Sequence, residues 1–184
     1  MQADLDKSAL RQSLIAARKA LSAEDKIQSD RRIMAALEVF LSTQTIQVLG
    51  VYLPLSGEPD LRPLYEALRK QNIHIALPVV LEKNQALHYA LWRPGDTLIK
   101  DASGTQAPAA REGFVQPELI LAPCVGFTES RYRLGYGGGY FDRTLAQAQQ
   151  MLAVGIAYSF TCVDFAVSNH DIALNWILTE EKLI

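Results

Sequence analysis

The sequence lacks the features that mark several classes of protein. It contains two cysteines, Cys124 and Cys162, which lie far apart without a paired-cysteine spacing or nearby histidines. Neither a zinc site nor a disulfide framework is therefore indicated. No apolar run approaches membrane-spanning length, and the N-terminal residues alternate charged and apolar types instead of forming a signal peptide. We expect a cytoplasmic protein.

A strong excess of charge of either sign is also missing. The 184 residues carry a net charge of −2, so the whole chain does not attract nucleic acid or membranes, and any basic site must be local. The chain also lacks a segment that interleaves aromatic and basic residues, which argues against a nucleic-acid-binding module. A chain of this length can bury about 70% of its unfolded surface. We therefore expect residues 1–184 to form one domain. We also expect the protein to be a monomer.

Helical and strand-like apolar patterns alternate along the chain, which predicts an α/β fold. The predicted helices cover residues 5–21, 22–41, 61–71 and 140–150, and the predicted strands cover residues 45–53, 73–80, 86–92, 119–123, 152–158 and 176–179. Two strand–helix–strand units should have parallel strands, so the loops that follow two of the strands could flank one cleft at the carboxyl edge of the sheet. Residues 93–117 carry a weak signal and are predicted to be a long excursion with short turns.

The stretch Arg133-Leu-Gly-Tyr-Gly-Gly-Gly-Tyr-Phe-Asp-Arg143 predicts a phosphate-binding loop that runs into a helix. Its glycines let backbone N–H groups turn toward an anion at the start of a helix, and Arg133 and Arg143 suit phosphate oxygens. Asp142 would either favour the helix dipole or hold a divalent cation. The stretch matches neither the Walker A nor the dinucleotide-binding pattern, so a flexible turn with a helix-starting Asp142 is the alternative.

Two further groups of charged residues have both a functional and an ordinary interpretation. Lys7, Arg11 and Arg18 share one face of the first predicted helix. Spacing alone favours a solvated basic stripe, and the alternative is a face turned toward an anionic ligand. Glu58 lies in a turn-rich loop at the predicted carboxyl edge, and its position fits a ligand-binding acid and an exposed loop acid equally well.

The remaining candidates are weaker. Asp171 could supply a second oxygen ligand for a metal, although a capping or turn role explains it as well. Cys124 is expected to be an inert core thiol and not a nucleophile, because no nearby group visibly lowers its pKa. His74 is predicted to pack in the core, and His88 is predicted to lie on the surface.

Four motifs in this order resemble one family. They are Lys7-x3-Arg11 with Arg18, then Gly57-Glu58, then the stretch 133–143, then Asp171 followed by Ile177-Leu-Thr-Glu180. Over nearly the whole chain they resemble the 5-formyltetrahydrofolate cyclo-ligases, also called 5,10-methenyltetrahydrofolate synthetases. The resemblance implies a single-domain, three-layer α/β sandwich with a mostly parallel central sheet and a helical N-terminus. It also implies an enzyme that uses ATP as co-substrate and Mg²⁺ as cofactor.

The resemblance further implies a role for individual residues. ATP would contact Lys7, Arg11, Arg133, Leu134, Gly135, Tyr136, Gly137, Gly138, Gly139, Tyr140 and Phe141. The folate would contact Leu53, Glu58, Tyr136, Gly137, Gly138, Gly139 and Tyr140, and Mg²⁺ would contact Asp142 and Asp171. The implied reaction cyclises 5-formyltetrahydrofolate to 5,10-methenyltetrahydrofolate through an iminium phosphate and releases ADP and phosphate.

Three departures from the family pattern concern local turns and the edge of the folate pocket. Arg131 stands where the family usually has glycine, Ala107-Pro108 replaces an acid–proline pair, and Leu174-Asn175 replaces a Val-Asp pair. Two other functions fit the same motifs: a non-catalytic protein that binds folate or nucleotide, and an enzyme similar to sugar-phosphate isomerases. A requirement for ATP would separate these functions from the cyclo-ligase reaction.

Overall fold

The computed structural model describes residues 2–111, 113–148 and 150–184. The helices are α1 (Gln2–Lys19), α2 (Ala23–Ser42), α3 (Arg62–Lys70), α4 (Tyr140–Gln147) and the 3-10 helix η1 (Ser159–Thr161). The strands are β1 (Val48–Gly50), β2 (His74–Val79), β3 (His88–Leu91), β4 (Leu98–Lys100), β5 (Gln106–Pro108), β6 (Leu119–Pro123), β7 (Gly126–Phe127), β8 (Arg133–Leu134), β9 (Leu152–Ile156) and β10 (Trp176–Leu178).

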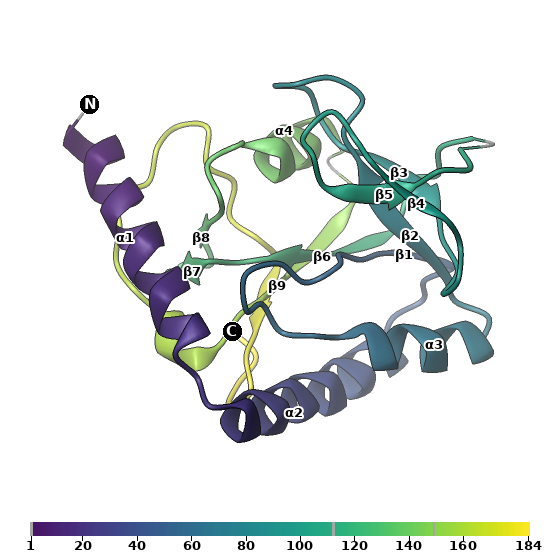
Figure 1. The fold of residues 1–184 in the computed structure, drawn as a ribbon, viewed down its shortest axis with the longest axis horizontal. Coiled ribbons are helices and arrows are strands. Elements are labelled where there is room, and N and C mark those ends of the chain that lie inside the picture. The colour runs from purple at the N-terminus through teal and green to yellow at the C-terminus, as the bar shows by residue number, and fades with distance from the viewer. Residues whose placement is uncertain (1, 112, 149) are drawn as a thin grey trace.

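A six-stranded sheet in the order β10-β9-β6-β1-β2-β3 forms the centre of the molecule (Figure 1). Its neighbouring strands are parallel except for β3, which pairs antiparallel with β2 at one edge. The strand order reverses after β1, because β2 lies on one side of it and β6 on the other. Such a reversal leaves a crevice beyond the carboxyl ends of the strands, which is where open α/β sheets bind ligands.

Helices cover both faces of this sheet and make three layers (Figure 1). On one face α2 and α3 pack against the sheet, with Leu37 and Tyr65 fully buried among the strand residues. On the other face α4 contributes Leu145 and Phe141 to a smaller apolar cluster. These two cores hold the sheet rigidly between the helices, so the loops at its carboxyl edge start from fixed positions.

Helix α1 stands across the end of the sheet, beside the β7–β8 hairpin (Figure 1). Leu14 of α1 packs there against Val125 and Leu134. After α1 ends, the Ser22 hydroxyl accepts a hydrogen bond from the Asp25 N–H (3.0 Å) and caps α2 as the sequence predicted. The N-terminal helix therefore rests on the segment that leads into the glycine-rich stretch.

Several sequence-based expectations differ from the structure in detail. The strand predicted over 45–53 pairs as a ladder over Val48–Gly50, because the chain beyond it turns out toward the carboxyl edge. The excursion 93–117 contains the β4–β5 hairpin, and a second hairpin, β7–β8, separates β6 from the glycine-rich stretch. Strands of two or three residues are too short to give a periodic signal. The helix predicted over 140–150 ends at Gln147, and Gln149 lies outside the described residues.

The two strand histidines have different outcomes. His88 is exposed as predicted. The prediction that His74 packs in the core is wrong, because His74 is exposed at the amino end of β2, where the strand has only begun to enter the sheet. The apolar residues that follow it, Ile75 to Leu77, supplied the buried pattern on which that prediction rested.

No helix in the described part of the chain is long and apolar enough to cross a membrane.

Candidate functional site

A cleft of about 580 Å³ opens at the carboxyl ends of β1, β2 and β6. Its walls come from α1, the loops after β1 and β2, the β4–β5 hairpin, residues 133–142 and the segment before β10. Every residue that the family resemblance assigned to ATP, folate or Mg²⁺ lines this one cleft. The parallel sheet therefore brings together side chains that are separated by as many as 164 residues in sequence.

The five residues from Gly135 to Gly139, here called the glycine loop, connect β8 to α4. Gly137 (φ 97°) and Gly139 (φ 64°) adopt the left-handed conformation that glycine tolerates without strain, and Gly139 caps α4. Arg11 of α1 fastens this turn, since its Nε donates a hydrogen bond of 2.7 Å to the Gly135 carbonyl. The loop is therefore held in shape by the N-terminal helix and is not a loose connection.

Arg133 and Asp142 form an ion pair at the back of the glycine loop. The guanidinium donates to the Asp142 carboxylate over 2.7 Å, and the Arg133 side chain is 5% exposed. The guanidinium also lies over the Phe141 ring, 4.9 Å from its centroid. Within residues 2–111, 113–148 and 150–184, Arg133 Nε finds no hydrogen-bond acceptor. A buried cation with an unused donor is suited to a further anionic partner.

A second ion pair joins the two ends of the chain. Lys7 Nζ lies 2.9 Å from Asp171 Oδ2, and the same carboxylate accepts a hydrogen bond from the Ser168 N–H. Partial burial alone would raise the pKa of Asp171, but the hydrogen bonds and the charge of Lys7 outweigh it and lower the pKa below its usual value. Asp171 therefore stays ionised. The turn role that the sequence left open is real, and it coexists with a place in the cleft.

Glu58 is a buried acid, 2% exposed, at the centre of the same cleft. Its two oxygens accept hydrogen bonds from the Leu55 N–H and from the Tyr136 hydroxyl, each 2.8 Å long. Burial raises the pKa of Glu58, and these hydrogen bonds together with the positive charge of Arg18 only partly oppose the rise. The interpretation of Glu58 as an exposed loop acid is therefore wrong. The loop after β1 places Glu58 against Tyr136, and Glu58 is buried there.

The basic face of α1 is not a solvated stripe. Lys7 and Arg11 line the cleft, and Arg18 is 2% exposed behind it. Arg143 behaves differently from the prediction, because its guanidinium donates to the carbonyls of Gln85 and Gly138 and does not line the cleft. It braces the start of α4 from outside. The phosphate-binding interpretation of Arg143 is therefore not supported.

Sequence reasoning missed part of the cleft wall. Asp101, Ser103, Thr105 and Gln106 reach it from the β4–β5 hairpin. Asp101 is used within the hairpin, where its carboxylate accepts the Val80 N–H (2.8 Å) and ties the hairpin to the end of β2. The turn residues in 93–117 signalled a structured excursion, but nothing local in the sequence indicated where it would dock.

Cys124 is inert as expected. The thiol is 1% exposed, and burial raises its pKa to about 12. It would be protonated at neutral pH and is shielded from any ligand, so it cannot serve as a nucleophile.

The three departures from the family pattern lie outside the cleft lining. Arg131 has φ 66°, a left-handed conformation that suits the glycine it replaces, and two hydrogen bonds with Leu174 hold it there. Asn175 accepts the Ala153 N–H, and Ala107-Pro108 belongs to β5. None of the three departures therefore replaces a residue of the cleft lining.

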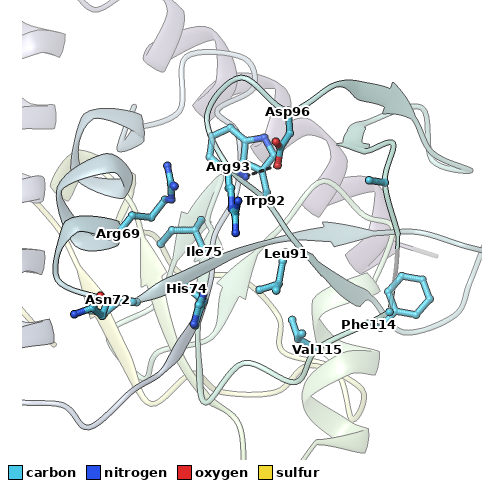
Figure 2. Close-up of a pocket in the computed structure, with 13 residues that line it drawn as sticks. Arg69, Asn72, His74, Ile75, Leu91, Trp92, Arg93, Asp96, Phe114 and Val115 are labelled. Atoms are coloured by element: carbon cyan, nitrogen blue, oxygen red, sulfur yellow. Dashed lines mark hydrogen bonds between the residues drawn. The ribbon is translucent and has the colours of Figure 1, made fainter.

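A second hollow, of about 650 Å³, lies at the opposite end of β2 (Figure 2). It is bordered by Arg69, His74, Arg93 and Phe114, and the Arg93 N–H donates to the Asp96 carboxylate (2.7 Å). This hollow contains none of the residues that the sequence analysis selected as ligand contacts.

The sheet with its crevice at a reversal of strand order, and the glycine loop with charged side chains around it, place the chain among α/β enzymes that bind ligands at the carboxyl edge of a parallel sheet. A family model, the 5-formyltetrahydrofolate cyclo-ligase family, matches residues 3–180. The chain therefore belongs to this family of enzymes.

Individual relatives agree over almost their full length. A 5-formyltetrahydrofolate cyclo-ligase from Mycoplasma pneumoniae is 32% identical over 96% of this chain and 100% of the relative. A solved 5,10-methenyltetrahydrofolate synthetase from the same organism superposes with a TM-score of 0.77 at 29% identity, over 95% of this chain and 99% of that one. The synthetase from Aquifex aeolicus gives a TM-score of 0.80 at 28% identity, over 96% and 91%. The predicted family and fold class are confirmed.

Proposed function

We propose that this protein converts 5-formyltetrahydrofolate to 5,10-methenyltetrahydrofolate in a reaction that consumes MgATP, with residues 1–184 acting as one catalytic domain. The observation that carries the proposal is that one cleft combines the glycine loop and its cations with the buried Glu58 and apolar side chains. The glycine loop with its surrounding cations suits a polyphosphate, and the buried Glu58 beside apolar walls suits a flat heterocycle with N–H donors.

The phosphate subsite would use the backbone and the cations together. Gly137 and Gly139 carry no side chains, so backbone N–H groups of this part of the loop can approach phosphate oxygens. Lys7, Arg11 and Arg133 surround this loop. Fixed cations and amides stabilise the charge that spreads over a phosphoryl group during transfer, and this is the main protein contribution to such reactions.

The donor set fits Mg²⁺ that arrives with the nucleotide. Among the described residues no three His, Cys, Asp or Glu side chains gather into a metal site. Mg²⁺ commonly uses one or two carboxylates and takes its other ligands from water and substrate phosphates, and Asp142 and Asp171 meet that need. When bound, the ion would neutralise phosphate charge.

The ion pairs in the cleft suit an exchange of partners when MgATP binds. Lys7 and Arg133 are now paired with the two carboxylates proposed for Mg²⁺. Both charges of each pair are compensated in this state, which keeps burial of the charges tolerable. Binding of MgATP would offer phosphates to the cations and a cation to the carboxylates, so each charge would exchange one partner for another.

The folate subsite would lie between Leu53, Glu58 and Tyr136. A carboxylate whose two oxygens already accept hydrogen bonds still has lone pairs for N–H donors of a pterin-like ring. Apolar lining from Leu53 and Leu87 suits the faces of the ring. Phosphate and folate subsites share the glycine loop, which would place the formyl group next to the terminal phosphate.

The proposed chemistry has two steps. The formyl oxygen on N5 attacks the γ-phosphorus of ATP, the bond to the ADP oxygen breaks, and an iminium phosphate forms. N10 then attacks the activated carbon, loses its proton, and phosphate departs with the former formyl oxygen. Phosphorylation is needed because an amide oxygen is a poor leaving group. No protein nucleophile is required, in agreement with the inert Cys124.

The test follows the near-ultraviolet absorbance of the methenyl product in a mixture of the purified protein, 5-formyltetrahydrofolate and MgATP. We expect a signal that requires all three components and disappears when ATP or magnesium is omitted. A folded protein that binds ATP saturably but forms no product would refute the proposal and favour a binding protein or a phosphosugar enzyme.

A further inference from the structure

Arg18 is a buried cation that the proposed catalytic groups leave unexplained. It lies in the last turn of α1, is 2% exposed, and is not part of the cleft lining. Burial of a guanidinium is unfavourable unless its donors are used and its charge is compensated. Its position directly behind the cleft therefore calls for a role.

A short chain of hydrogen bonds connects Arg18 to the centre of the cleft. One guanidinium nitrogen donates to the Tyr136 hydroxyl over 2.8 Å, and that hydroxyl donates to Glu58 Oε1 over 2.8 Å. The other terminal nitrogen donates to the Cys124 carbonyl over 3.2 Å. The guanidinium thus contacts the glycine loop and the end of β6 directly, and reaches the Glu58 loop through Tyr136.

The chemistry of the donors fixes the direction of this chain. A guanidinium can only donate hydrogen bonds, so the Tyr136 oxygen must accept from Arg18 and its one hydrogen must point to Glu58. The Leu55 N–H donates to the other oxygen of Glu58 over 2.8 Å. Both oxygens of Glu58 are therefore approached by donors, which is the arrangement that favours the ionised carboxylate.

The backbone around Arg18 is fitted closely to it. Gly57 has φ 78°, and a Cβ at Gly57 would lie 3.5 Å from the Arg18 carbonyl carbon. A side chain at this position would be strained by the backbone conformation, and its Cβ would be in van der Waals contact with the end of α1. The loop that carries Glu58 thus rests directly on the end of α1 next to Arg18.

We propose that Arg18 is a positioning residue that acts through Tyr136, holding Glu58 ionised and fixed in orientation while it fastens the glycine loop over the folate subsite. The contribution of Arg18 to catalysis rests on the proposed function, whereas the effect of Arg18 on the ionisation of Glu58 does not. Because Tyr136 belongs to the glycine loop and bonds to Glu58, the relay would also couple occupancy of the phosphate and folate subsites.

The other titratable groups that face Glu58 are uncharged at neutral pH, so the charge of Arg18 is the one that acts on the pKa of Glu58. Tyr52 and Tyr65 face it from the loop after β1 and from α3, and Cys124 faces it from the end of β6. Burial raises the pKa of all three, so they are uncharged at neutral pH. Arg18 supplies the positive charge that opposes the burial-driven rise in the pKa of Glu58.

The experiment reads Glu58 directly. The side-chain carboxyl carbon is assigned by its loss in Glu58→Gln and titrated by ¹³C NMR in the wild type, Arg18→Met and Tyr136→Phe. We expect the titration midpoint to rise in both variants, and to rise in the double variant by less than the two single shifts together. Lys19→Met removes one exposed positive charge from the same helix and serves as the matched control, with an unchanged midpoint.

Kinetics then separates a positioning role from a structural one. In Arg18→Met, Glu58 should ionise only at higher pH, so the acid limb of the pH profile of kcat/KM for the folate should shift to higher pH. The KM for the folate near neutral pH should rise about tenfold, as expected for loss of a hydrogen bond to a charged group. Arg18→Lys, which restores the charge, should recover part of this loss.

The outcomes can be told apart. An unmoved Glu58 midpoint in folded Arg18→Met would overturn the relay, and so would a kinetic loss that is the same at every pH. Should Arg18→Met fail to fold, Tyr136→Phe carries the same readout at a half-exposed side chain. A wild-type protein that makes no methenyl product, but whose Glu58 midpoint still moves with Arg18, would refute the proposed function and leave the relay standing.

Discussion

Two of the hollows of this molecule, the cleft and the hollow at the amino end of β2, differ little in size and strongly in construction. The cleft at the carboxyl edge has a volume of about 580 Å³, and the hollow at the amino end of β2 has about 650 Å³ (Figure 2). The cleft holds charged side chains that are paired and buried or partly buried, among them Arg133 and Lys7. The hollow displays Arg93 on an exposed turn. Volume therefore does not distinguish a functional site here, and burial of charge does.

The difference follows from which chain segments meet at each place. The cleft is built from both ends of the chain, three loops and a hairpin, and its Lys7–Asp171 ion pair spans 164 residues. The hollow is built from the α3–β2 turn and two neighbouring segments along β3. Holding buried charges together costs desolvation energy that surface arginines avoid. Buried charges that cost desolvation energy are therefore expected where they bind a ligand.

The largest effect is expected from breaking the ion pair at the glycine loop. Arg133→Ala removes a phosphate partner and leaves Asp142 without its cation. We expect kcat/KM for ATP to fall about tenfold to a hundredfold, because a hydrogen bond to a charged group contributes about 1.5–3 kcal/mol. Stability should fall as well, since loss of one partner of a buried pair costs about 3–5 kcal/mol, and less here because Asp142 is 20% exposed.

Steady-state kinetics and urea unfolding measure the two effects of Arg133→Ala separately. Arg133→Lys is the matched variant, because it keeps the charge but loses the forked geometry, and it should lie between the alanine variant and the wild type. A folded Arg133→Ala protein with wild-type kinetics would remove Arg133 from the site and weaken the contrast between the two hollows.

An intermediate effect is expected at the proposed magnesium position. Asp142→Asn keeps the shape of the side chain but removes its charge, so Mg²⁺ loses one anionic ligand. We expect the magnesium concentration for half-maximal activity to rise by about tenfold, with less change when magnesium is saturating. A magnesium titration at fixed ATP measures this. An unaltered titration curve would leave Asp142 as the acid of a helix start and the partner of Arg133.

The comparison also explains what could be predicted from sequence. Local signals pointed to part of the cleft: four glycines beside arginines indicated an anion loop, and the strand pattern put Glu58 at the carboxyl edge, whereas the residues of the β4–β5 hairpin were missed. The partners were not predictable, because Arg18 meets Tyr136 across 118 residues and Tyr136 meets Glu58 across 78. Such contacts depend on how the hairpin β7–β8 places the loop, and strands of two residues leave no periodic trace.

Arg133 and Arg143 also show that sequence position alone does not predict which side chain faces the ligand. Arg133 and Arg143 flank the glycine-rich stretch symmetrically in sequence, and both were expected to hold phosphate. In the structure Arg133 lies in β8 and points into the cleft, whereas Arg143 lies on the outer side of α4 and donates to the Gln85 carbonyl over 3.2 Å. A helix turns successive side chains by about 100°, so flanking a loop does not mean facing its ligand.

The smallest effect is expected in the hollow of Figure 2, and it sharpens the comparison most directly. Arg93→Ala is the same chemical change as Arg133→Ala, made in a hollow of slightly larger volume. Because the Arg93 side chain is exposed, we expect the free energy of unfolding to change by less than about 0.5 kcal/mol and the kinetics for both substrates to stay at wild-type values. Urea unfolding and the methenyl absorbance assay, run beside Arg133→Ala, measure both quantities.

A change of about threefold or more in either KM would mean that ligand binding extends to this hollow, because such a change exceeds what an exposed side chain contributes through stability alone. Burial of charge would then no longer separate the functional site from the rest of the surface.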